Sequence, residues 1–484
     1  MNQLKSIARR LLANRGFLPD FSDAALAQAS AASAPEPNRA EGVHDLRELL
    51  WVSIDNDASR DLDQLSVAEA LPGNTTRVFV AIADVDAVVK RDSAIDQHAQ
   101  TNTVTVYTAA ATFPMLPERL STDITSLNEN EARLAIVIDF EVRADGTLGK
   151  SAVYRAYVQS RAKLAYNSVA AWLEGAAGAA GAPAQVTPPI AEQLKMQDRA
   201  AQLLRKQRFQ HGALSLQTPH AEPIFNGDQL TDLRSEVGNR AKELIEDFMI
   251  AANGVVARFL SDERFPSVRR VLRSPERWAR IVDLAQRQGG ALPTQPDGAA
   301  LAHFLTERRA RDPEGFPELS LSVVKLLGRG EYVIDLPGEK ALGHFGLAAS
   351  DYGHSTAPNR RFADLLTQRL IKAALDQEAP PYSAARLTEL ANHCNEQEVN
   401  AAKIERQVEK SAAAQLLTAR LHERFDGIIT GASQKGTWVR INHPAVEGKI
   451  VSGAQGLDVG DHVRVELTRV DIEQGFIDFA REGQ

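Results

Sequence analysis

Apolar positions near the start of the chain recur at helical spacing, at Leu4, Ile7, Leu11 and Leu12. Gly16 and Pro19 interrupt this run, so we expect two short helices within about residues 1–27. The segment 29–42 that follows is rich in Ala, Ser and Pro, a composition that is typical of a linker.

The next region, from about residue 46 to 379, contains both periodicities of secondary structure. Strand-like runs come first, at residues 50–54, 77–82 and 134–142. Longer helical patterns follow, at residues 241–260 and 364–375, and a helical pattern returns over 384–424. These patterns predict one large domain that mixes strands and helices, and we expect an α+β fold.

The tail, from about residue 425 to 479, changes to short alternating segments that are separated by glycine. These segments include the runs 427–429, 436–441, 448–450 and 461–467. Such spacing predicts a small closed β-barrel.

The composition is that of an ordinary folded protein, with 484 residues of which 44% are hydrophobic and 24% charged. This length predicts more than one domain, and no segment approaches the ~20 consecutive apolar residues of a membrane span. The single cysteine, Cys394, excludes an internal disulfide and a cysteine-based zinc cluster, so we expect a cytoplasmic protein. The net charge of −8 argues only weakly against nucleic-acid binding, because local clusters of charge matter more than their sum.

Four aspartates crowd together directly after the first strand-like run: Asp55, Asp57, Asp61 and Asp63. Crowded carboxylates repel one another, so the arrangement costs stability unless a cation or a base neutralises it. Carboxylate oxygens suit Mg²⁺ or Mn²⁺, and paired ions of this kind activate water for phosphodiester hydrolysis. The alternatives are a solvated acidic loop and a single Ca²⁺ site, although the loop lacks the Gly and the distal Glu of an EF-hand.

The same segment resembles the catalytic signature of the RNB domain, which ribonuclease II and ribonuclease R share. The resemblance lies in Ile54-Asp55 followed by Arg60-Asp61-Leu62-Asp63-Gln64-Leu65. Further motifs resemble the family in order along the chain, at residues 80–85, 113–121, 245–253 and 343–364. The tail resembles the OB-fold RNA-binding module named after ribosomal protein S1, on residues 425–429, 439, 460–463 and 471.

The resemblance implies a domain order that agrees with the hydrophobic pattern. Residues 1–42 form a helical N-terminal segment with its linker. Residues 43–420 form the RNB catalytic domain with its trailing helices, and residues 421–484 form the OB barrel. Common family members have two cold-shock barrels before the RNB domain, and residues 1–42 are too few to encode them. We expect this segment to brace the catalytic domain, with a helix-turn-helix-like RNA-binding element as the alternative.

The activity that the resemblance implies is processive 3′-to-5′ hydrolysis of single-stranded RNA to 5′-mononucleotides and a short limit oligonucleotide. It also implies Mg²⁺, with Mn²⁺ as an alternative, at a site formed by Asp55, Asp61, Asp63 and Gln64. Gln64 stands where the family has a fourth aspartate, and a neutral amide is a weaker metal ligand. We expect the additional carboxylate, Asp57, to point to solvent.

We expect Asp61, Asp63 and Arg360 to be the catalytic residues. Arg360 lies in a Pro-x-Arg-Arg turn and matches a family residue at the scissile phosphate, which a guanidinium group binds in a bidentate manner. The alternative is a structural ion pair, for which Glu246 is the candidate partner. The chain departs from the family beside this arginine, with Ala357 and Asn359 where Ser and Ile are usual.

Tyr107 matches a family tyrosine that stacks on the 3′-terminal base and sets the length of the limit product. The alternative is a buried core tyrosine. We expect further RNA contacts from Tyr166, Glu246, Arg361, Trp438 and Arg440. Glu246 or its neighbour Asp247 is a candidate acceptor for a ribose 2′-hydroxyl, with a place on the helix surface as the alternative for either. Trp438 offers a stacking surface unless it lies in the barrel core.

Two other groups of residues leave their roles open. Arg269, Arg270 and Arg273 either flank RNA or are exposed without a function. His344 and His354 either contact phosphate or hold their loop. For the whole chain, the alternatives are an RNB-fold RNA-binding protein without catalysis and a metal-dependent endonuclease, and we expect a monomer.

Overall fold

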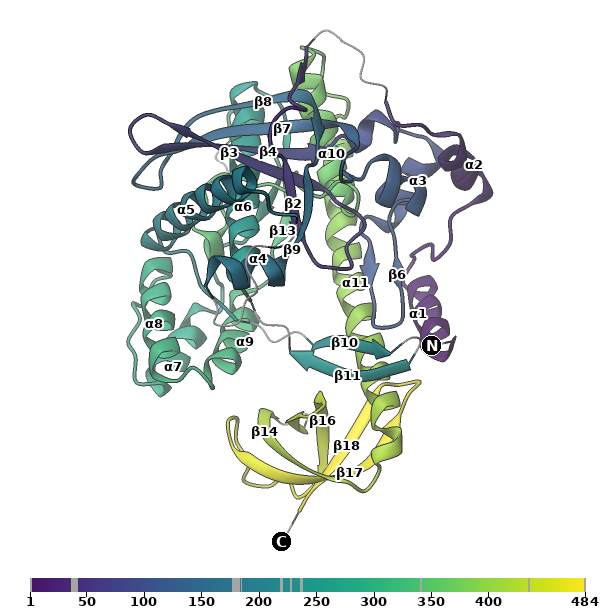
Figure 1. The fold of residues 1–484 in the computed structure, drawn as a ribbon. Coiled ribbons are helices and arrows are strands. Elements are labelled where there is room, and N and C mark those ends of the chain that lie inside the picture. The colour runs from purple at the N-terminus through teal and green to yellow at the C-terminus, as the bar shows by residue number, and fades with distance from the viewer. Residues whose placement is uncertain are drawn as a thin grey trace.

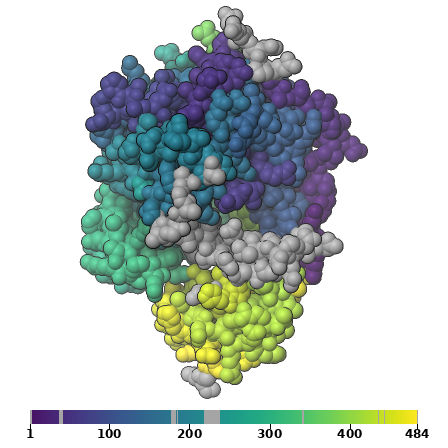
Figure 2. Space-filling view, in the orientation of Figure 1, coloured from purple at the N-terminus to yellow at the C-terminus, as the bar shows by residue number. Residues whose placement is uncertain are grey.

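The structure, a computed structural model, describes residues 2–35, 42–175, 183, 185–217, 221–226, 229–235, 238–339, 342–433 and 436–482. The end of the predicted linker, residues 36–41, lies outside these ranges. Figure 1 and Figure 2 show a large domain in the upper part of the molecule and a smaller lobe below it.

A seven-stranded mixed sheet forms the centre of the large domain. Its order is β1 (Val43–Asp45), β8 (Leu148–Gln159), β7 (Ala132–Val142), β4 (Thr75–Ala83), β3 (Gln64–Leu71), β2 (Val52–Asp55) and β9 (Ala162–Ala165). The pairs β1–β8 and β2–β9 are parallel, and the other neighbours are antiparallel. Together with the helices below, this sheet confirms the predicted α+β fold.

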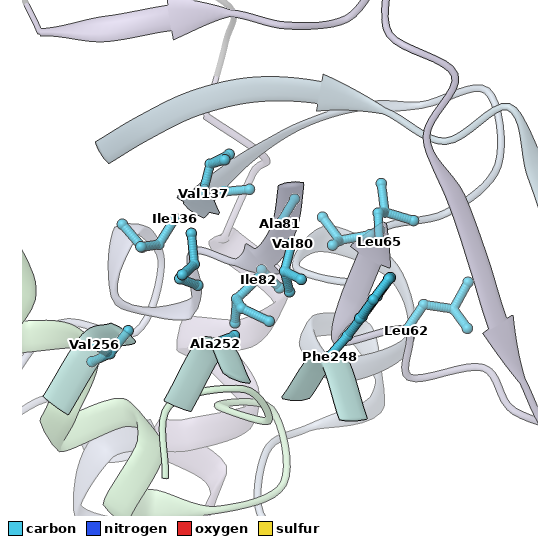
Figure 3. Close-up of a cluster of buried hydrophobic side chains, with 14 of the residues drawn as sticks. Leu62, Leu65, Val80, Ala81, Ile82, Ile136, Val137, Phe248, Ala252 and Val256 are labelled. Carbon is cyan, nitrogen blue, oxygen red and sulfur yellow. The ribbon is translucent and has the colours of Figure 1, made fainter. Parts of the chain in front are cut away.

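Two long helices, α5 (Pro188–Gln210) and α6 (Arg240–Asp262), pack on one face of this sheet. On α6, the buried residues Phe248, Ala252 and Val256 recur every fourth position and so form one stripe. Figure 3 shows them facing Ile82 and Ile136, which are direct cross-strand neighbours on β4 and β7. The same sheet carries the acidic loop, between β2 and β3.

A buried network of ion pairs fixes helix α10 (Phe362–Leu375) against the end of β4. Lys372 contacts Asp84 at 3.0 Å and Asp86 at 2.9 Å. Arg369 contacts Asp86 at 2.9 Å and Asp96, on α3 (Ala94–Asn102), at 2.8 Å. Because the Arg360 turn directly precedes α10, the network also positions that turn relative to the sheet.

Smaller elements surround this core. Helices α7 (Trp278–Arg287), α8 (Gly298–Arg311) and α9 (Phe316–Leu327) share a separate hydrophobic cluster. Helix α4 (Tyr166–Leu173) also lies outside the sheet. Three pairs of short strands accompany it: β5 (Val106–Tyr107) with β6 (Thr112–Phe113), β10 (Ala221–Asn226) with β11 (Gln229–Ser235), and β12 (Ser267–Val271) with β13 (Glu331–Asp335). None of the helices in the described ranges combines the length and hydrophobicity that crossing a membrane requires.

Helix α11 (Ala384–Leu417) runs from the large domain to the smaller lobe (Figure 1). The lobe is a closed barrel of β14 (Arg424–Ser433), β15 (Gly436–Asn442), β16 (Ala445–Ser452), β18 (Phe476–Arg481) and β17 (His462–Asp471). Strands β16 and β18 approach so closely that a Cβ atom on Gly448 would lie 2.6 Å from the carbonyl oxygen of Ile477. The barrel predicted from the tail is therefore confirmed.

The N-terminal segment forms two helices, α1 (Asn2–Asn14) and α2 (Asp23–Ala31), as predicted. The Ser22 side chain caps α2 by accepting a hydrogen bond from the Ala25 N–H. Helix α1 packs against α11 and buries the apolar face that its spacing predicted. Helix α2 reaches Ala31, so the start of the predicted linker is helical.

Candidate functional site

The acidic loop joins β2 to β3, and its backbone is pinned at Leu62. The N–H of Leu62 donates to the Ser126 hydroxyl at 3.0 Å, and its carbonyl accepts from the Leu127 N–H at 3.0 Å. Leu62 is buried between Asp61, which is half-buried, and Asp63, which is 2% exposed. Asp57 is exposed, as expected.

The Asp63 carboxylate lies at the buried end of this loop and faces the Arg360 turn. It accepts hydrogen bonds from Arg360 Nε at 3.3 Å and from the Asn359 N–H at 3.1 Å. Burial raises the pKa of Asp63 to about 7, although Arg360 and the Asn359 N–H act in the opposite direction. A further cation that binds beside this buried carboxylate would stabilise its charged form.

Arg360 therefore pairs with Asp63, and the predicted alternative of an ion pair with Glu246 is wrong. The Arg360 side chain is 45% exposed, so one side of the guanidinium is open while Nε faces Asp63. Glu246 instead lies 4.0 Å from Arg205 of α5. The arrangement leaves Arg360 able to meet a phosphate beside Asp63.

The neighbouring arginine, Arg361, is turned into the domain. It donates to Asp364 at 2.8 Å, and the same Asp364 oxygen accepts from the Ala357 N–H at 2.8 Å. The fully buried Asp364 raises the pKa of Arg361 further above its usual range, against the effect of burial. These contacts give Arg361 a role in holding the turn, and its predicted contact with RNA stays a prediction.

Tyr107 lies beside the acidic loop, on β5. Its hydroxyl donates to Asp61 at 3.2 Å, and its backbone N–H donates to Glu405 of α11 at 3.0 Å. The Tyr107 side chain is 46% exposed, so the alternative of a buried core tyrosine is wrong.

Tyr166 and Glu246 lie on α4 and α6, two helices that contact each other. Tyr166 opens α4 directly after Ala165, which is paired with Asp55 across β9 and β2. The Lys242 ammonium lies 5.8 Å from the centre of the Tyr166 ring, and Glu246 follows one turn later on the same helix. Glu246 is exposed, so its side chain is accessible to a ligand.

The two candidates on the barrel, Trp438 and Arg440, point outward from it. They alternate with Thr437 and Val439, which are buried, so Trp438 does not belong to the barrel core. Arg440 forms an ion pair with Glu318 of α9. This pair ties the barrel to the large domain, and the proposed RNA contacts of both residues stay predictions.

The arginines of the basic run, Arg269, Arg270 and Arg273, are all paired with carboxylates. Their partners are Asp335 at 2.9 Å, Glu398 at 2.7 Å and Glu331 at 2.6 Å. Arg269 is also only 1% exposed, so the reading of three exposed arginines is wrong.

The two histidines hold their loop. His344 accepts from the Leu347 N–H at 3.2 Å, and His354 lies 2.8 Å from the Tyr332 hydroxyl. Burial lowers the pKa of His344 to about 4, so its ring is neutral near pH 7.

The contacts that pin the site were largely missed from the sequence. Ser126 holds Leu62 and the backbone of Asn359 holds Asp63, but a hydrogen bond to a backbone group has no signature in one sequence. In the sequence, Asn359 stands out only as a departure from the family pattern. It accepts from the Thr125 hydroxyl at 2.6 Å, and its amide nitrogen is buried without a hydrogen-bond partner.

The residues around Asp63 suit a magnesium ion that is completed by other ligands. Asp61 lies close enough to Asp63 to raise its pKa, whereas Asp55 accepts from the Ser59 hydroxyl at 2.8 Å. Gln64 is 8% exposed at the start of β3. Within the described ranges, no three His, Cys, Asp or Glu side chains gather as a ready-made metal cage. Mg²⁺ is usually bound by one or two carboxylates, with water and substrate phosphates as the other ligands, so Asp61 and Asp63 fit it.

Comparison with protein families gives two matches along the chain. The RNB domain matches residues 43–377, and the RNase II-type exonuclease C-terminal S1 domain matches residues 423–482. The second match covers the barrel.

Similar proteins agree with these matches. Ribonuclease R of Aquifex aeolicus is 29% identical over 466 residues, which are 90% of this chain and 64% of that protein. Ribonuclease R of Escherichia coli is 29% identical over 486 residues, 92% of this chain and 58% of that protein. The chain spans about three fifths of the length of these relatives.

The fold is also similar to that of a solved structure, Mycoplasma genitalium RNase R in complex with ribose methylated single-stranded RNA. The TM-score is 0.88 at 21% identity, over 99% of this chain and 78% of that one.

Proposed function

Because the chain belongs to the RNB family, we propose that it is a metal-dependent exoribonuclease that hydrolyses single-stranded RNA processively from the 3′ end. The products are 5′-mononucleotides and a short limit oligonucleotide. The observation that carries the proposal is the buried Asp63, which faces an open Arg360 guanidinium and has Asp61 and Tyr107 beside it.

The proposed roles follow from these positions. Asp61 and Asp63 hold Mg²⁺ or Mn²⁺, with Asp55 and Gln64 as further candidate ligands. When bound, the metal activates water and stabilises the leaving oxygen of the phosphodiester. Arg360 neutralises the scissile phosphate from its exposed side. Tyr107 stacks on the 3′-terminal base, which a sequence-tolerant enzyme requires.

The outer contacts of the RNA are assigned to residues around this centre. Glu246 accepts a ribose 2′-hydroxyl, Tyr166 lines the path to the metal, and Arg361 supports that path by holding the Arg360 turn. Trp438 and Arg440 bind the RNA further upstream, on the barrel. We place the domain boundaries at residues 43 and 421, and the proposed protein is a cytoplasmic monomer.

The experiment that tests this function follows 5′-labelled single-stranded RNA on a denaturing gel, with Mg²⁺ and with EDTA. The expected result is loss of full-length RNA with direct appearance of one short limit product, and no reaction in EDTA. Scattered internal fragments would identify an endonuclease instead.

A second candidate function is an RNA-binding protein that has lost catalysis. The feature that favours it is Gln64, which replaces a carboxylate beside Asp63. Intact RNA that still shifts on a native gel would support this candidate. The buried Asp63 and its partner Arg360 argue against it, because binding alone gives no reason to keep a buried carboxylate with a raised pKa.

Restoring the fourth carboxylate is expected to tighten metal binding. In Gln64→Asp, the Mg²⁺ concentration for half-maximal activity should fall roughly tenfold, a change of the size that ligand-shell substitutions produce. The measurement is the initial rate over a Mg²⁺ titration. Gln64→Asn is the matched control, because it has the size of Asp without the charge. An unchanged or higher Mg²⁺ requirement in Gln64→Asp would contradict the account of this position.

The pH dependence of activity should depend on the Mg²⁺ concentration. Asp63, with a pKa of about 7, holds a proton at lower pH, and that proton competes with the metal. At limiting Mg²⁺, the rate is therefore expected to fall about tenfold per pH unit below this pKa. Saturating Mg²⁺ should move the midpoint to lower pH. Initial rates from acidic to alkaline pH at two Mg²⁺ concentrations test this, and a midpoint that does not move would refute it.

A further inference from the structure

Three consecutive residues contact both the acidic loop and the Arg360 turn. We call them the strap: Thr125, Ser126 and Leu127, which are 4%, 0% and 1% exposed and precede β7. The strap reaches Leu62, 64 positions earlier in the chain, and Asn359, 234 positions later. It therefore joins the two segments that supply the carboxylates and the arginine of the proposed site.

The Ser126 hydroxyl holds the backbone on both sides of Asp61. It accepts from the Leu62 N–H at 3.0 Å and donates to the Arg60 carbonyl at 2.9 Å. Asn128 Oδ1 also lies 2.9 Å from this hydroxyl, so the two acceptors share its one proton. A residue whose backbone is held before and after it has few conformations left. Ser126 thus restricts where the Asp61 carboxylate lies.

The next residue of the strap extends this hold towards Asp63. The Leu127 N–H donates to the Leu62 carbonyl at 3.0 Å. The two peptide groups that join Leu62 to Asp61 and to Asp63 are therefore both held by the strap. Fixed carboxylates suit Mg²⁺, because this ion demands near-ideal octahedral geometry.

The first residue of the strap reaches the Arg360 turn. The Thr125 hydroxyl lies 2.6 Å from the side-chain oxygen of Asn359 and 2.8 Å from the Leu120 carbonyl. Asn359 is 1% exposed, and its backbone N–H donates to Asp63 at 3.1 Å. The residue directly before Arg360 is thus tied both to the strap and to the buried carboxylate.

We propose that Ser126 is a positioning residue of the metal site, which holds Asp61 where it can share an ion with Asp63, and that Thr125 holds the Arg360 turn to the same segment. This inference rests on the proposed function, in which both carboxylates hold Mg²⁺. A group that fixes the positions of others acts on the chemical step, because a small misplacement slows that step strongly. It contributes little to RNA affinity, since buried side chains make no contact with RNA.

The first test is Ser126→Ala, which removes the hydroxyl and keeps the backbone of the strap. We expect kcat to fall about 10- to 10²-fold while KM for RNA changes little. The Mg²⁺ concentration for half-maximal activity should rise about tenfold. Mn²⁺ binding, followed by loss of the electron paramagnetic resonance signal of the free ion, should weaken to the same extent without any reaction taking place.

Ser66→Ala is the matched control. Ser66 is 1% exposed on β3, and its hydroxyl donates to Gln197 of α5 at 2.7 Å. The control therefore loses a buried hydroxyl of the same kind that does not contact the acidic loop. It should lower Tm as much as Ser126→Ala does, with kcat and Mn²⁺ binding unchanged.

A second test asks whether Ser126 acts through Asp61. In an Asp61→Asn background, Ser126→Ala is expected to have almost no further effect on the single-turnover rate, because the carboxylate that it positions is already gone. Residues that act independently would instead multiply their effects.

The third test compares two replacements of Thr125. Thr125→Val keeps the shape of the side chain, removes the hydroxyl and leaves the Asn359 side chain buried without this partner. It should lower kcat about tenfold. Thr125→Ser keeps the hydroxyl and removes a methyl group, so it should retain most of the rate.

Several results would overturn the positioning role. One is a Ser126→Ala variant that loses only Tm, as Ser66→Ala does, and another is an effect that multiplies fully with that of Asp61→Asn. If Ser126→Ala does not fold, equal rates in Thr125→Val and Thr125→Ser would overturn the role of the strap. A wild-type protein that does not shorten RNA from the 3′ end refutes the proposed function, whereas unchanged Mn²⁺ binding in Ser126→Ala refutes this inference alone.

Discussion

Replacing the Asp63 carboxylate with an amide is expected to abolish hydrolysis while RNA binding persists. Asp63→Asn keeps the shape of the side chain and removes the charge that holds the metal. The rate should fall roughly 10³-fold or more, at least the effect of losing one group that stabilises the transition state. RNA affinity, measured by fluorescence anisotropy, should change little, because most of the binding surface lies outside this loop.

The fold should also tolerate Asp63→Asn. Since Asp63 has a pKa of about 7, an uncharged group at this position is already present in part of the metal-free molecules near neutral pH. Tm measured without metal is therefore expected to stay the same or to rise. Asp57→Asn, on the exposed part of the same loop, is the control and should retain full activity. Loss of RNA binding together with cleavage in Asp63→Asn would undermine the assignment of the metal site.

Arg360→Ala should reduce kcat by roughly 10²- to 10³-fold, because a charge that faces the scissile phosphate is lost. The same change removes the strongest of the influences that lower the pKa of Asp63, so that pKa should rise further. The activity that remains is therefore expected to require a higher pH than that of the wild-type protein. Single-turnover rates over a pH series measure both effects.

Two further variants separate catalysis from structure at this turn. Arg360→Lys keeps the charge but not the planar fork, so it should recover only part of the rate. Arg361→Ala leaves the fully buried Asp364 without its cation, and should lower Tm before it lowers kcat. If Arg360→Ala changed only Tm, Arg360 would be a structural residue.

The features that the sequence predicted well are those with a local cause. Two N-terminal helices, the α+β core and the C-terminal barrel follow from apolar spacing within short segments. The carboxylates of the loop were visible because Asp61 and Asp63 are neighbours in sequence. Even the exposure of Asp57 follows from its place in a short loop.

The features that were wrong or missed depend on contacts between distant segments. Arg360 pairs with Asp63, almost 300 positions earlier in the chain, and nothing near either residue indicates that pairing. Arg269, Arg270 and Arg273 form a basic run in sequence, but their carboxylate partners come from β13 and α11. Periodicity places a side chain on a face of an element, and it does not say which element covers that face.

The packing of α1 against α11 affects how the protein folds during its synthesis. Leu12 of α1 and Ala412 of α11 belong to one buried apolar cluster and are separated by about 400 residues. At about 5–20 residues per second, a ribosome needs roughly 20–80 s to synthesise that interval. Throughout this time, α1 lacks the part of its apolar cluster that α11 supplies. The apolar face of α1 is thus fully buried only after α11 has been synthesised, and until then it presents a binding site for chaperones.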